Sequence, residues 1–213
     1  DTIQHVLKNL LLGFVVIEQT SKKLILKNMS NEIESEFNPA LRRAFLVTMS
    51  LANSSLDEIS AKQFSNLNSL INLEMSNNQL TSFCLRLMNK GLYKDEEGKV
   101  FLATIIWNTE KIADEYKIIC TNLTENTEAV NPEILKIYGE VNKLFVEYYE
   151  LFYNFSPEKL NLLVDKKYEI TNKINNVKTN KEHETKLLMA LSTIVSKTSD
   201  LSSSIFGLNY KKL

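Results

Sequence analysis

Glycine and proline are scarce in this sequence, with five glycines and three prolines among 213 residues. Sandwiches and barrels of short β-strands need many turns, and turns favour these two residues. Their scarcity therefore predicts long helices. Hydrophobic residues make up 44% of the chain, which is enough for a core and excludes a disordered protein.

Long apolar runs are also missing. The longest, Leu10–Ile17, is far shorter than the roughly 20 residues that cross a bilayer, and no basic segment precedes it. We therefore expect no membrane insertion and no signal peptide, and hence a cytoplasmic protein. The two cysteines, Cys84 and Cys120, lack metal-ligand spacing, which favours reduced thiols in the core.

The chain has no excess of positive charge, since 25 basic residues face 26 acidic ones and the formal charge is -1. Proteins that coat nucleic acid are more basic than this. The GxGxxG, P-loop, HExxH and GxSxG motifs are absent. The two histidines, His5 and His183, have no second ligand at i+3 or i+4. We therefore expect a protein that is not an enzyme.

Each proline follows a residue that favours the helix N-cap, in the pairs Asn38-Pro39, Asn131-Pro132 and Ser156-Pro157. An N-cap residue followed by proline is typical of a helix start. Together with the apolar periodicity, these starts predict six long helices, over residues 39–59, 62–90, 99–125, 132–155, 157–178 and 181–208. A short helix over Thr2–Leu12 and a β-hairpin of Phe14–Glu18 and Lys23–Lys27 should precede them.

The two halves of the chain resemble each other. The Asn-Pro pair recurs at an offset of 93 residues, and the apolar pattern of the third helix recurs at an offset of 86. Such a repeat predicts an all-α fold of two tandem three-helix bundles, preceded by the short helix and hairpin. The expected boundaries are a linker over 1–30, a first unit over 31–127 and a second unit over 128–213.

Carboxylate pairs one helical turn apart are the candidate functional residues. Glu110 and Asp114 have i,i+4 spacing and lie opposite the apolar face of their predicted helix. Two such carboxylates repel each other, and a hard or borderline cation between them turns repulsion into attraction. A solvated helix surface is the alternative interpretation of the same spacing.

Related pairs recur at the corresponding positions of the other predicted helices. They are Glu74 with Asn78, Asp165 with Glu169, and Ser196 with Asp200.

Two three-helix units with E/DxxxD motifs resemble the PhoU family of phosphate-uptake regulators. Asn108–Tyr116 (NTEKIADEY) is similar to that family's "LERIADHA"-like segment. Leu41–Leu46 (LRRAFL) resembles the segment that opens the first helix of archaeal members. Leu11–Ile17 (LLGFVVI) resembles the linker that, in those members, follows a small AbrB-like DNA-binding domain.

The resemblance implies a homodimeric helical adaptor that restrains phosphate import and signalling. Its partners would be the ATPase of a phosphate ABC transporter or a sensor protein, with DNA contacted only through a domain outside this chain. It also implies metal binding (Mg, Fe, Mn or Zn) through the acidic pairs. Carried over residue by residue, the metal ligands are Glu74, Asn78, Glu110, Asp114, Asp165, Glu169 and Asp200.

Two other functions remain open at this point. The chain would serve as the dimerisation module of an AbrB-like transcription regulator if its metal motifs have degenerated, as Asn78 and Ser196 suggest. A metal-dependent enzyme is the third possibility, but no histidine lies near either motif to act as a general base.

Overall fold

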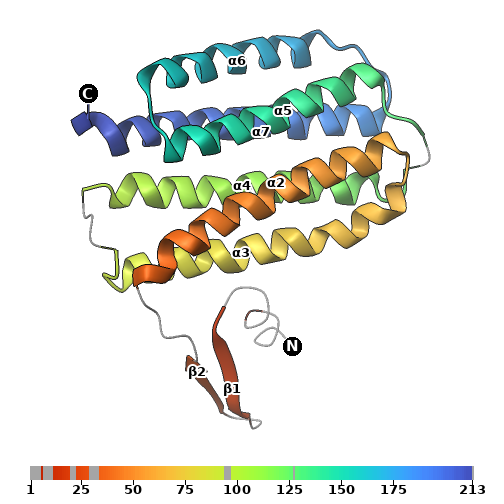
Figure 1. The fold of residues 1–213 in the computed structure, drawn as a ribbon. Helices are drawn as coiled ribbons and strands as arrows, with labels where there is room; N and C mark the ends of the chain where they lie inside the picture. The colour runs from red at the N-terminus through yellow and green to blue at the C-terminus, as the bar shows by residue number, and fades with distance from the viewer. Residues whose placement is uncertain are drawn as a thin grey trace.

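The structure, a computed structural model, describes residues 6, 12–19, 23–28, 34–93, 97–126 and 128–212. It is mostly helical, with a short two-stranded hairpin near the N-terminus (Figure 1). The strands are β1 (Phe14–Gln19) and β2 (Leu24–Asn28). The long helices are α2 (Phe37–Ser60), α3 (Leu67–Asn89), α4 (Lys99–Leu123), α5 (Pro132–Tyr153), α6 (Pro157–Asn176) and α7 (Glu182–Asn209). The predicted helical class and the hairpin are thus confirmed, whereas the helix predicted over Thr2–Leu12 falls almost entirely outside the described residues.

Two of the three predicted helix starts are confirmed. The side chain of Asn131 accepts a hydrogen bond from the backbone N–H of Glu133 at 2.9 Å, and that of Ser156 accepts one from Lys159 at 3.1 Å. Proline follows each of these caps at the first helical position, where its missing N–H costs nothing.

The predicted start at Asn38-Pro39 is wrong. Helix α2 begins at Phe37, after a 3₁₀ turn over Glu34–Glu36, so that Pro39 lies inside the first helical turn. Phe37 is 2% exposed, and its ring centroid lies 5.0 Å from that of Tyr93. The helix thus begins two residues before the proline, at a residue whose ring is buried.

The six long helices form two groups of three. Consecutive helices α2, α3 and α4 contact one another, and so do α5, α6 and α7. Helix α4 also lies along α7, and α2 lies along α5, which joins the two groups (Figure 1). The fully buried side chains include Phe45, Tyr138 and Tyr148 at this join.

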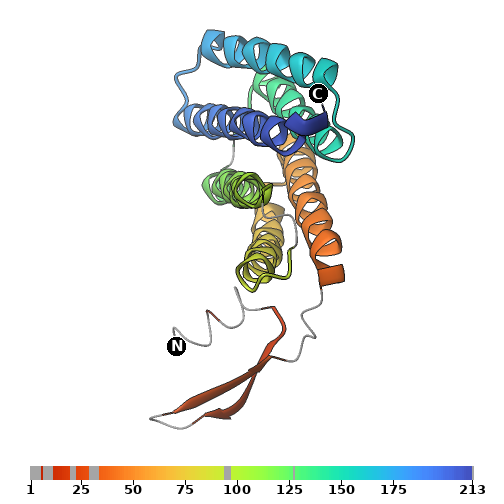
Figure 2. The same ribbon diagram turned by 90° about the vertical axis from the view of Figure 1, so that its left-hand side faces the viewer.

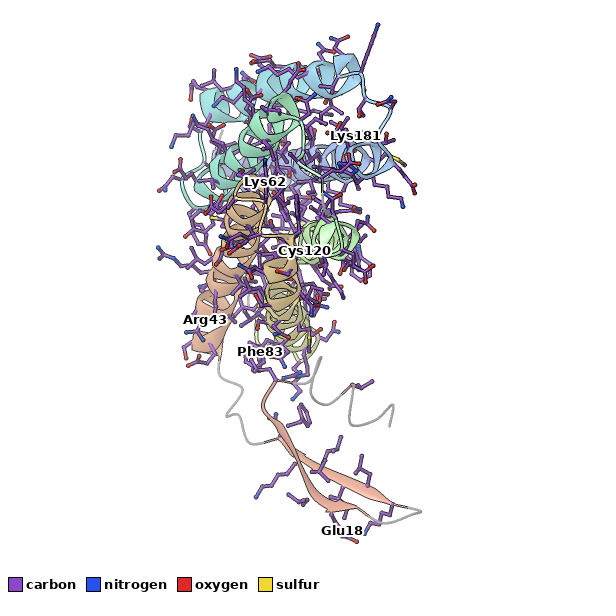
Figure 3. The ribbon with its side chains drawn as sticks, turned by 90° about the vertical axis from the view of Figure 1, so that its right-hand side faces the viewer. Glu18, Arg43, Lys62, Phe83, Cys120 and Lys181 are labelled. Carbon is purple, nitrogen blue, oxygen red and sulfur yellow. The ribbon has the colours of Figure 1, made fainter. Side chains whose placement is uncertain are left out.

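The hairpin projects from the end of the bundle where α2 starts and α3 ends (Figure 2). Its strands pair antiparallel, with an irregularity between Val16 and Glu18. Arg86 of α3 links it to the bundle, because its Nη2 donates to the carbonyl oxygen of Leu12 at 2.8 Å and its guanidinium lies 5.0 Å from the ring centroid of Phe14. Phe83 is at the hairpin end of the bundle, and Glu18 is at the far end of the hairpin (Figure 3).

A buried polar cluster joins α2, α4 and α5. Tyr116 of α4 donates to Oδ1 of Asn142 on α5 at 2.9 Å, and Nδ2 of Asn142 donates to the carbonyl oxygen of Ala52 on α2 at 2.8 Å. Beside them the hydroxyls of Tyr138 and Ser55 share a hydrogen bond of 2.7 Å. Both tyrosine rings are fully buried and stack with centroids 6.0 Å apart. Burial raises the pKa of both phenols, so both hydroxyls stay protonated at physiological pH.

Both cysteines are buried and free, as predicted. Burial raises the pKa of each thiol to about 12, so neither is a thiolate at neutral pH. In the part of the chain that the structure describes, no helix is long and apolar enough to span a bilayer.

Replacing Asn142 with leucine should lower the free energy of unfolding by about 2 kcal/mol, because the Tyr116 hydroxyl then loses its acceptor inside the core. Urea unfolding of the purified chain measures this. The matched control is Asn161→Leu on the exposed side of α6, which should change stability by less than about 0.5 kcal/mol. Equal effects of the two substitutions would show that the cluster does not hold the helices together.

Candidate metal centre

The predicted pair Glu110 and Asp114 does lie on α4 away from its buried face, with side chains 19% and 32% exposed. The ammonium of Lys111 bridges the two carboxylates. Its Nζ lies 3.0 Å from Oε1 of Glu110 and 2.8 Å from Oδ2 of Asp114. Lys111 also lies over the ring of Trp107, with Nζ 4.9 Å from the centroid. A side-chain cation therefore occupies the place between the carboxylates where a metal ion would bind.

The hydrogen bond to Asp114 is the main cause that raises the pKa of Lys111; burial opposes this rise, and the neighbouring Glu110 adds to it. Lys111 therefore remains charged at neutral pH. Glu115, on the side of α4 next to α7, has its own pKa raised by burial. The charge of Lys197 on α7 opposes that rise, whereas Asp114 adds to it.

The second predicted pair, Glu74 and Asn78, lies on α3 and is more deeply placed. Glu74 is 1% exposed, and Nδ2 of Asn78 donates to its Oε1 at 2.5 Å. Lys117 of α4 brings its Nζ to 3.0 Å from Oε2 of the same carboxylate. The charge of this buried acid is thus balanced from the neighbouring helix.

Two amide oxygen atoms near Glu74 are available as ligands. Oδ1 of Asn77 and Oδ1 of Asn78 are buried and accept no hydrogen bond, whereas Oε2 of Glu74 already pairs with Lys117. Carboxylate and amide oxygens are ligands that hard cations such as Mg²⁺ prefer. The donor type therefore fits a metal ion, but Asn77 turns its amide nitrogen to α2, where it donates to the carbonyl oxygen of Ala44 at 3.1 Å. The fit is partial, because one carboxylate supplies the whole negative charge.

The metal ligands predicted in the second half of the chain lie on other helices than Glu74 and Glu110. Asp165 and Asp200 are exposed on α6 and α7, respectively. Glu169 is 64% exposed and pairs with Lys173 at 2.6 Å. Lys173 reaches across to Glu140 of α5 at 2.9 Å, so these charges hold α6 to α5. Glu140, Glu169 and Lys173 line an open cavity of about 190 Å³ between α5 and α6.

Among the described residues, the structure brings together no group of three or more histidine, cysteine, aspartate or glutamate side chains that would hold a metal ion. The proximity of Glu110 to Asp114 and of Glu74 to Asn78 agrees with their spacing. What the spacing missed are the two lysines. Lys111 follows Glu110 directly and precedes Asp114 by three residues. This position within the motif could have predicted from the sequence that Lys111 pairs with both carboxylates. Lys117 lies 43 residues from Glu74, and no local pattern connects them.

Comparisons of this chain with family models, with curated proteins and with solved structures found no match.

Replacing Lys117 with alanine should lower the free energy of unfolding by about 1–3 kcal/mol, because the carboxylate of Glu74 is then buried without a counter-charge. Urea unfolding at neutral pH checks this. The control is Lys186→Ala on α7, whose partner Glu182 is 81% exposed, and the loss there should stay below about 0.5 kcal/mol. Adding Glu74→Gln to Lys117→Ala should recover part of the loss. If the two lysine variants unfold alike, Glu74 does not depend on Lys117.

Proposed function

We propose that this chain is a PhoU-like, non-enzymatic regulator of phosphate uptake that acts as a helical adaptor. The observation that carries the proposal is the order of the helix contacts. Two groups of three consecutive helices contact one another, α2 to α4 and α5 to α7. This order supports two tandem three-helix units, with boundaries near residues 31–127 and 128–213. The acidic pair Glu110 and Asp114 lies on the third helix of the first unit, where the resemblance places a functional motif.

The proposed partners are the ATPase of a phosphate ABC transporter or a sensor protein, met in the cytoplasm by a homodimer. The partner would contact the charged side chains on the outer side of α4. The three side chains Glu110, Lys111 and Asp114 form a compact group that is partly open to solvent. Such a group suits recognition of a charged partner surface, since it presents both signs of charge within one helical turn.

An AbrB-type dimerisation module is the second candidate, and the projecting hairpin favours it. Ile17 is 59% exposed on β1, although a two-stranded hairpin is only marginally stable in water by itself. The hairpin would then connect the helical body to a DNA-binding segment outside this chain.

Measuring phosphate uptake separates the two candidates. Deleting the gene should raise uptake of labelled phosphate in phosphate-rich medium by several fold, because the transporter loses its restraint, and supplying the full-length protein should reverse the change. Sulfate uptake serves as the control and should stay constant. Unchanged phosphate uptake together with shifted transcript levels of other genes would contradict a role in regulating uptake. It would support the dimerisation module of a transcription regulator instead.

We also propose that the acidic pair of α4 binds a divalent or iron-type metal ion in competition with Lys111. Removing the competing ammonium with Lys111→Met should raise the affinity for Mn²⁺ by about tenfold, the effect of an interaction of about 1.4 kcal/mol. Isothermal titration with chelator-treated protein measures it. The control Lys173→Met on α6 should leave this affinity unchanged. Glu110→Ala/Asp114→Ala should abolish binding, and binding that survives it would place the metal elsewhere.

A further inference from the structure

Helix α6 is the most weakly anchored of the six long helices. It packs against α5 and α7 at the outer edge of the second group (Figure 2). Only three of its 20 residues are buried, namely Leu163, Ile170 and Ile174. Helix α3 has the corresponding outer place in the first group and buries twice as many apolar side chains, which are Leu67, Leu80, Phe83, Cys84, Leu87 and Met88. Because apolar burial is the main attraction between packed helices, α6 is held far less firmly than α3.

A lysine interrupts the apolar face with which α6 meets its neighbours. The positions of this face recur at steps of three and four residues, and they are Leu160, Leu163, Lys167, Ile170 and Ile174. Lys167, at the centre, is partly buried, and its Nζ lies 5.4 Å from the ring centroid of the exposed Tyr168. The ammonium ion keeps its contact with water, because burying it without a counter-charge is costly. The middle of the face therefore contributes little to the attachment of α6.

Two ion pairs connect one edge of α6 to α5. Lys166 pairs with Glu147, and Lys173 pairs with Glu140 at 2.9 Å. The lysines are seven residues apart on α6 and the glutamates seven apart on α5, so the pairs form a ladder between antiparallel helices. The two lysine side chains are 44% and 38% exposed. Salt screens ion pairs that are this open to solvent.

Open cavities border α6 on both of its sides. On the α5 side, the cavity of about 190 Å³ has the buried residues Leu144 and Ile170 in its wall. A second cavity on that side, of about 210 Å³, lies next to Leu163. On the α7 side, Ile174 and Leu188 line a cavity of about 430 Å³. Side chains beside a cavity lack contacts that a closely packed interface provides, so the few apolar side chains of α6 are incompletely packed.

The residues of α6 also give it little tendency to stay helical by itself. It contains four asparagines, which are Asn161, Asn172, Asn175 and Asn176. Asparagine is a poor helix former, and in proteins most of the stability of a helix comes from packing against its neighbours. Once detached, α6 would therefore unfold instead of remaining a free helix.

We propose that α6 is a strap that detaches from α5 and α7 as one cooperative unit while the other five long helices stay folded, and that its ladder of ion pairs makes the opening salt-sensitive. Weakly packed segments of proteins open in this way without global unfolding. The opening uncovers Leu144 on α5 and Leu188 on α7, which are 1% and 8% exposed in the closed state. The strap thus controls access to an apolar surface of the second helix group, whether or not the chain regulates phosphate uptake.

Hydrogen exchange of the full chain, followed by mass spectrometry of its peptides, tests the opening. We expect the amides of α6 to exchange together, at least about 30-fold faster than the best protected amides of α3, α5 and α7. Raising sodium chloride from about 0.05 M to about 1 M should speed exchange of α6 by about threefold or more relative to α3, because both ion pairs are then screened.

Two substitutions at Lys167 test whether the interrupted face limits the attachment. Lys167→Leu should slow the exchange of α6 by about tenfold, because a leucine at this position adds apolar burial. Lys167→Gln is the matched control, since it removes the charge without filling the face, and it should change exchange by less than about threefold. Circular dichroism checks that both variants are folded.

Thiol labelling tests whether the opening uncovers the surface beneath α6. In the Leu144→Cys variant, a maleimide reagent should modify the introduced thiol at least about tenfold faster than Cys84 and Cys120, which are 0% exposed and serve as internal references.

Exchange of α6 and α3 at one common rate would overturn the proposal, as would an equal effect of salt on both helices. Labelling of all three thiols at one rate, or equal effects of Lys167→Leu and Lys167→Gln on the exchange of α6, would also overturn it.

Discussion

The hydrogen bonds of Asn142 fix α2, α4 and α5 relative to one another, because they are made where these three helices meet. Its amide accepts from one helix and donates to another, so neither neighbour can slide without leaving a buried polar group unpaired. The stacked rings of Tyr116 and Tyr138 complete the join on the same level. Packing of apolar side chains alone would tolerate several relative positions of the two helix groups, and this cluster selects one of them.

Helix α4 contacts α2, α3, α5 and α7, and its remaining side is not covered by any helix among the described residues. Its buried face meets α2, Lys117 reaches α3, and Glu115 faces α7. The remaining side carries Trp107 and the charges around Lys111. The same helix therefore supports the core and presents the candidate metal centre. Any change in how α3 or α7 packs would shift this exposed group, because α4 lies between them.

The helical class, the hairpin and two of the proline-marked helix starts followed from local pattern, since each depends on a few neighbouring residues. The start at Asn38-Pro39 did not, because burial of Phe37 against Tyr93 is a contact between distant segments. The closeness of Glu110 to Asp114 could be predicted from helical spacing alone. The pairing of Glu74 with Lys117 could not, because it depends on which side of α3 meets α4.

The packing of α7 along α4 has a consequence for folding during synthesis. Helices α2, α3 and α4 are complete once residue 123 has left the ribosome, yet one side of α4 stays uncovered until α7 has been made. Asn142 and Tyr138 likewise reach their partners on α2 only after α5 appears. The nascent first half thus exposes apolar surface for the time needed to translate about 80 further residues, at roughly 5–20 residues per second.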